Sequence, residues 1–96
     1  MKIWLEWLRP YVGPDQSCQA FSTKENVVGY WDDERRRSGM APLTDEEKTM
    51  AVFDMAKNGE SRMPISSFGL HGLVFSYVRE VEVDEYYTRK QQEKPI

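Results

Sequence analysis

The chain has 96 residues, of which 40% are hydrophobic and 30% charged, and its formal net charge at pH 7 is −3. This length predicts a single domain, residues 1–96. The 12% of aromatic residues excludes a wholly disordered chain. One cysteine excludes an internal disulfide and fits a reducing compartment. No apolar run approaches the roughly 20 residues that cross a bilayer, so we expect a cytoplasmic protein without membrane association.

The first predicted element is a short amphipathic helix over residues 2–9, ending near Pro10. Its apolar residues fall at helical spacing on one stripe: Trp4, Trp7, Leu8 and Tyr11. The alternation of Ile3, Leu5 and Trp7 also permits a strand. That alternative leaves Trp4 and Leu8 on the opposite side, so the helix is preferred.

A second helix is expected to begin at the capping box Ser22–Glu25 and to end at Gly39. Two pairs with the acid four residues before the base support it: Asp32–Arg36 and Asp33–Arg37. Gly29 lowers the helix propensity of the segment by about 1 kcal/mol relative to alanine. The segment around Pro42 then reads as a linker.

Residues 44–81 have the clearest start and stop signals in the chain. Thr44 and Glu47 form a second capping box, and Asn58-Gly59 supplies a left-handed C-cap. Another helix is expected to open near Pro64, because proline is tolerated in a first turn. Its apolar stripe comprises Leu70, Leu73, Val74, Tyr77, Val78 and Val81. These signals predict an antiparallel helical hairpin that forms the main core.

The end of the chain is compatible with two structures. Val81 and Val83 alternate with acidic residues, as in an exposed strand, yet the same residues continue the helical stripe. We favour a long final helix to about residue 90, followed by a flexible tail over 91–96. The expected fold is mainly α, with about four helices around the 44–81 hairpin. The alternative is α+β, with strands near 77–87 and 27–31.

No motif for catalysis, a cofactor or a metal is present. Nucleophilic catalysis would need Cys18 or a serine near the single histidine, His71, and nothing in the sequence brings them together. A zinc site needs three or four closely spaced ligands. We therefore expect neither an enzyme nor a cofactor.

The order helix–NGES–helix is similar to a helix-turn-helix, which makes a DNA-binding regulator the alternative function. The expected second helix has no Arg, Lys, Asn or Gln before Arg79, although those residues make most contacts to bases. The net negative charge also opposes DNA binding. Nucleic acid is therefore the weaker expectation for a partner.

The remaining signal is the surplus of tryptophan, tyrosine and clustered arginine, residue types that are enriched in binding hot spots. The candidate partner-binding residues are Trp4, Trp7, Tyr11, Trp31, Arg35, Arg36 and Arg37. We expect a small non-catalytic protein that binds and regulates or inhibits a host protein or protein complex. Small size without catalytic motifs is typical of bacteriophage and mobile-element accessory proteins, including those that act on nucleases and defence enzymes.

Overall fold

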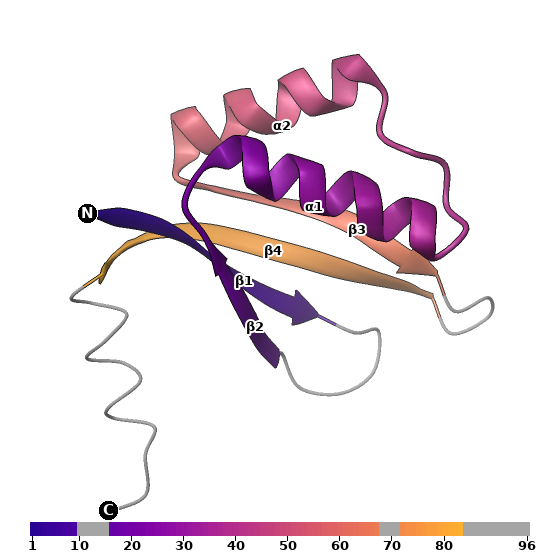
Figure 1. The fold of residues 1–96 in the computed structure, drawn as a ribbon, viewed down its shortest axis with the longest axis horizontal. Coiled ribbons are helices and arrows are strands. Elements are labelled where there is room, and N and C mark those ends of the chain that lie inside the picture. The colour runs from indigo at the N-terminus through magenta and orange to yellow at the C-terminus, as the bar shows by residue number, and fades with distance from the viewer. Residues whose placement is uncertain (10–15, 68–71, 84–96) are drawn as a thin grey trace, which may run out of the picture.

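The computed structural model describes residues 1–9, 16–67 and 72–83, with the backbone alone for 16–18. The elements are β1 (Lys2–Arg9), β2 (Gln16–Phe21), α1 (Lys24–Arg37), α2 (Asp45–Asn58), β3 (Glu60–Ser67) and β4 (Leu73–Glu82). The strands form one antiparallel sheet in the order β2-β1-β4-β3. Both helices lie over the same face of this sheet (Figure 1).

The prediction of a mainly α, helical protein with four helices is wrong, because the fold is α+β. Of the expected 44–81 helical hairpin only α2 is a helix, and β3 and β4 replace the second helix. Because β4 is apolar on both faces, its residues gave a false helical stripe. Pro64 is compatible with β3 since this strand lies at the edge of the sheet.

Two further expectations depended on the helical hairpin and are also wrong. A helix-turn-helix needs a recognition helix after the NGES turn, and a strand begins there at Glu60. The final helix to residue 90 is also wrong as far as residue 82, where β4 ends. Residues 84–96, including the expected tail over 91–96, lie outside the described residues. The α+β alternative named the right class, but its strand at 27–31 falls within α1.

β1 replaces the helix expected over residues 2–9, and the reason is again an element that is apolar on both faces. Trp4 and Leu8 point toward the helices and belong to the core or pack against it. Leu5 and Trp7 lie on the opposite face, because successive side chains of a strand alternate. The rejected alternation of Ile3, Leu5 and Trp7 was therefore the correct pattern.

The cap signals are confirmed for α2 and partly for α1. The side chain of Thr44 accepts from the N–H of Glu47, whose carboxylate accepts from the N–H of Thr44, which completes the capping box. Gly59 ends the helix with φ 70°. In α1 the cap is Thr23, one residue later than expected, and it accepts from the N–H of Asn26.

We expect Thr44→Ala to lower the free energy of unfolding by about 1 kcal/mol, because the N–H of Glu47 loses its acceptor. The measurement is urea denaturation followed by circular dichroism. The matched control is Thr49→Ala in the same helix, where the hydroxyl bonds the carbonyl of Asp45. Alanine has the higher helix propensity there, so this variant should be neutral or slightly stabilised. Equal losses in both variants would contradict the role of the cap.

The core lies between the helix layer and one face of the sheet. It comprises Trp4, Val27, Val28, Trp31, Leu43, Ala51, Met55, Ile65 and Val78. Four of these residues belong to the helices and are at most 3% exposed: Val27, Trp31, Ala51 and Met55. The helices therefore cover one side of the sheet, and the other side is left for a different role.

Candidate functional site

The second side of the sheet, which we name the helix-free face, is covered by neither α1 nor α2. Alternation along the three strands β1, β4 and β3 assigns its residues. They are Ile3, Leu5, Trp7, Arg9, Glu60, Arg62, Pro64, Leu73, Phe75, Tyr77, Arg79 and Val81. Leu5 and Val81 are buried, whereas Trp7, Phe75 and Tyr77 are half-buried and the arginines are exposed. The face therefore presents partly accessible rings beside positive charges.

Strand register brings these rings and arginines together across β1, β4 and β3, toward the end of β1 at Arg9. Tyr77 of β4 lies opposite Trp7 on β1 and opposite Arg62 on β3. In the same way, Phe75 lies opposite Arg9. We name these five residues, Trp7, Arg9, Arg62, Phe75 and Tyr77, the aromatic–arginine cluster.

The arginines of the cluster are held by the rings. The guanidinium carbon of Arg9 lies 4.4 Å from the centroid of the Tyr77 ring. That of Arg62 lies 5.7 Å from the centroid of Phe75, and its Nη1 donates a hydrogen bond of 3.1 Å to the hydroxyl of Tyr77. Such cation–π contacts attract a guanidinium to the ring face, so both side chains are ordered over the surface.

The two arginines of the cluster lower the pKa of the Tyr77 phenol. The hydrogen bond from Arg62 lowers this pKa below its ordinary value of 10.0. Partial burial opposes the shift, but the positive charges of Arg62 and Arg9 add to it. A phenolate is thus favoured here relative to water, and the same field favours any bound anion.

Charge is segregated between the two sides of the sheet. The helix-free face has the arginines Arg9, Arg62 and Arg79 and, among the described residues, one acid, Glu60. The other described carboxylates belong to the helices or to positions of β1 and β4 on the helix side. The described residues of this face therefore carry more positive than negative charge, although the chain as a whole has a net charge of −3.

Two of the tryptophans expected to contact a partner lie in the core instead. Trp4 is 4% exposed and Trp31 is 0% exposed. The indole Nε1 of Trp31 donates to Ser76 Oγ at 2.7 Å. Trp7 is the one of the three that reaches the helix-free face, and Tyr11 lies outside the described residues.

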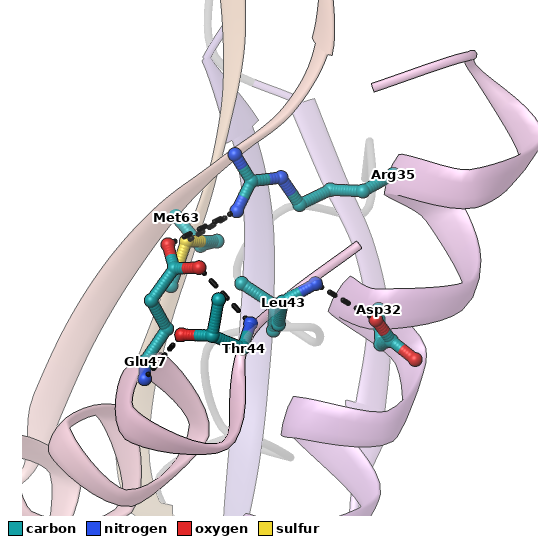
Figure 2. Close-up of polar contacts among 6 residues, drawn as sticks. All are labelled: Asp32, Arg35, Leu43, Thr44, Glu47 and Met63. Carbon is teal, nitrogen blue, oxygen red and sulfur yellow. Dashed lines mark hydrogen bonds and ion pairs between the residues drawn. The ribbon is translucent and has the colours of Figure 1, made fainter. Parts of the chain in front are cut away.

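Arg35, expected to contact a partner, instead joins α1 to α2 and β3 (Figure 2). Its Nη1 lies 3.4 Å from Glu47 Oε2 and 3.8 Å from Met63 Sδ. At the same junction the N–H of Leu43 donates to Asp32 Oδ1 at 2.9 Å, which fixes the loop between the helices. The Arg35 side chain is 12% exposed, and its contacts connect the two helices to β3.

The two following arginines form ion pairs within α1. Arg36 pairs with Asp32 at 3.0 Å, as expected. Arg37 pairs with Glu34 at 3.0 Å rather than with the expected Asp33. The structure therefore places the arginine triplet on the helix layer, away from the helix-free face, and neutralises its charges internally.

The core also contains a polar network that the sequence did not indicate. Glu6 and Ser76 are both 0% exposed. The Ser76 hydroxyl donates to Glu6, and the amide of Gln19 donates to the other carboxylate oxygen at 3.3 Å. Since Ser76 also accepts from Trp31, the network joins β2, β1 and β4 to α1. A glutamate between two tryptophans has no sequence signal that distinguishes it from a solvated one.

Tyr30 adjoins this network, and burial raises the pKa of its phenol above the ordinary 10.0, with the negative charges of Glu6 and Glu34 adding to the shift. The unfolded chain then loses this proton at lower pH than the folded protein. The stabilisation that depends on protonated Tyr30 is therefore complete below about pH 10 and is lost as the pH rises further.

We expect the free energy of unfolding to decrease between pH 8 and 11 in the wild type, and to decrease less steeply with pH in Tyr30→Phe. The measurement is urea denaturation at a series of pH values in this range. An unchanged pH slope in the variant would contradict this.

Sequence reasoning missed most of the helix-free face. The sequence pattern that could have identified this face is the alternation in β4, where Ser76 and Val78 separate Phe75, Tyr77 and Arg79. Reading this segment with a period of two would have placed the rings and the arginine on one side. The contribution of Arg62 depends on strand pairing, which the sequence does not show.

The described residues hold no group of three or more His, Cys, Asp or Glu placed to bind a metal ion. Within the same ranges, no helix has the length and apolarity needed to span a membrane. His71 lies outside the described residues, so its position relative to Cys18 is not defined. Comparison with protein-family models, curated proteins and solved structures found no match to this chain.

Proposed function

We propose that the chain is a small, non-catalytic cytoplasmic protein that docks on a host macromolecular complex through its helix-free face. By occupying that surface it would regulate or inhibit the complex, a role typical of bacteriophage and mobile-element accessory proteins. The observation that carries the proposal is the aromatic–arginine cluster, which lies on the face of the sheet that neither α1 nor α2 covers.

The chemistry of the cluster supports binding. Trp, Tyr and Arg are the residue types most enriched in interface hot spots, which lie near the centre of an interface. Arg62 is already ordered by Phe75 and by the hydroxyl of Tyr77. Ordering before binding reduces the entropy lost on association, so more of the contact energy appears as affinity.

The arginines of α1 provide an internal comparison. Arg36 and Arg37 are bound to carboxylates of their own helix at 3.0 Å. Arg62 instead contacts two aromatic side chains, Tyr77 and Phe75, and among the described residues it forms no ion pair. The helix-free face is thus better suited than the arginine triplet to attract an anionic partner.

The test is affinity capture of the tagged protein from bacterial lysate, with mass spectrometry and in parallel with variants. We expect a stoichiometric partner complex, with capture lowered at least about tenfold by Arg9→Ala plus Arg62→Ala, the equivalent of about 1.4 kcal/mol. Arg37→Ala on α1 is the matched control for loss of an arginine and should capture normally. Retained capture by the double variant, or no partner at all, would refute the proposal.

A further inference from the structure

The rings of the helix-free face form a continuous platform. Trp7 and Tyr77 are cross-strand neighbours, whose Cβ atoms are separated by about 4.5–5.5 Å in such pairs. Phe75 lies two residues before Tyr77 on the same face of β4, about 6.8 Å away at the usual rise of a strand. Unpaired bases stack on aromatic side chains and also on arginine guanidinium planes, so the guanidinium groups over Tyr77 and Phe75 extend the platform.

The positive charges around this platform favour a polyanionic ligand, bound on the helix-free face rather than on the helix layer. Arg9 and Arg62 lie at its centre, and Arg79 follows on β4. On the opposite layer α1 is neutral, with four acidic and four basic residues, and α2 has a net charge of −2, with four acidic and two basic. Phosphates are therefore attracted to the arginines of the helix-free face more than to the helix layer.

The rings and the positive charge together favour single-stranded nucleic acid over a duplex. The rings reach base faces only where bases are unpaired, since stacking within a duplex hides those faces. The face is a sheet surface, and neither of the described helices lies on it to enter a groove. An acidic protein segment would satisfy the arginines but would bring no flat π surface to the rings.

We propose that the helix-free face binds single-stranded nucleic acid, with bases stacked on Trp7, Phe75 and Tyr77 and phosphates held by Arg9, Arg62 and Arg79. This inference rests on the proposed function, since it names the component of the host complex that the face recognises. The sugar is not selected by these contacts, so RNA and DNA strands are both ligands.

The test is fluorescence anisotropy with labelled oligo-U and oligo-dT of about 15 nucleotides, a length near the upper site size of one small binding domain. We expect saturable binding at about 50 mM salt. A duplex of the same length should bind at least about tenfold more weakly. The logarithm of the association constant should fall with the logarithm of salt concentration with a slope of about −2, as expected for three phosphate contacts on a single strand.

Two variants separate stacking from charge. Phe75→Leu keeps an apolar side chain on β4 but removes a ring, and affinity should fall about tenfold with little change in the salt slope. Arg62→Gln should weaken binding and reduce the size of the slope by about 0.7. Circular dichroism verifies that both are folded.

The matched controls lie on the helix layer. Phe53 is 56% exposed on α2 with the ammonium of Lys57 5.9 Å from its ring centroid, so it reproduces an exposed ring beside a cation. Phe53→Ala and Arg37→Ala should bind oligonucleotides as the wild type does. Loss of affinity in these controls equal to that in Phe75→Leu would overturn the assignment of the face.

The possible failures are distinguishable. No oligonucleotide binding at about 50 mM salt, together with a captured complex that resists nuclease and depends on Arg9 and Arg62, would refute the single-strand inference and leave the proposed function, with a protein as partner. Oligonucleotide binding that is unaffected by Phe75→Leu and Arg62→Gln would also refute the inference. Capture that disappears with nuclease would support it.

Discussion

Trp31→Ala should lower the free energy of unfolding by about 3–5 kcal/mol, the usual range for removing a buried aromatic side chain. Trp31 is 0% exposed and packs in the core between α1 and the sheet. The substitution also leaves Ser76 Oγ without the indole N–H that donates to it at 2.7 Å. Since small domains are stable by only about 5–15 kcal/mol, this loss removes a large part of the total.

Urea denaturation followed by circular dichroism measures the effect, and two further variants divide it. Trp31→Phe retains much of the ring volume but loses the N–H donor, so a smaller loss is expected. Phe53→Ala removes an aromatic ring that is 56% exposed, and we expect less than about 1 kcal/mol. A loss of under about 1 kcal/mol in Trp31→Ala would contradict the assignment of Trp31 to the core.

Glu6→Ala is expected to destabilise the protein by at least about 3 kcal/mol. Glu6 accepts hydrogen bonds from Ser76 and Gln19 and interacts with the phenol of Tyr30. Each buried donor left without an acceptor costs about 1–3 kcal/mol, and the cavity adds to this. Removing the carboxylate therefore disrupts several partners at once.

Two comparisons make the Glu6 measurement specific. Glu6→Gln keeps the shape but replaces one acceptor with a donor, so we expect an intermediate loss. Glu80→Ala removes a carboxylate from β4 that pairs with Lys2 at 3.5 Å near the surface. Such pairs contribute at most about 1 kcal/mol. Similar losses for Glu6→Ala and Glu80→Ala would show that the buried network contributes little.

The helix ends were predictable because their signals are local. A capping box requires residues three apart, and both its hydrogen bonds form in α2 between Thr44 and Glu47. The left-handed cap at Gly59 likewise depends on one residue. For α1 the same signal identified the helix but misplaced its cap by one residue, since neighbouring Ser22 and Thr23 are both able to cap.

The strands were not predictable in the same way because β1 and β4 are apolar on both faces. The two central strands of the sheet carry core residues on one side and four of the five residues of the aromatic–arginine cluster on the other. A strand with apolar residues on both sides loses the alternation that identifies it. Glu6 is a further departure from the usual alternation, because a charged residue type occupies a buried position on the core side of β1.

Of the candidate site, the residue types were anticipated and most of the positions were not. Trp, Tyr and Arg were expected to contact a partner, and Trp7 does lie on the helix-free face. Arg62 and Tyr77 are fifteen residues apart and become neighbours only through the β3–β4 register. The arginine triplet was conspicuous in the sequence, but Asp32, Glu34 and Glu47 neutralise it.

The order in which a ribosome makes this chain conflicts with the order of strands in its sheet. β1 is synthesised first, yet one of its two neighbours is β4, with Lys2 aligned to Glu82. Until residue 82 has left the exit tunnel, the β1–β2 hairpin and the helices lack the strand that joins them. Pairing between such distant segments is slow to form. We therefore expect Trp4 and Leu8 to complete their packing only after β4 has been synthesised, because the core that they join includes Val78 of that strand.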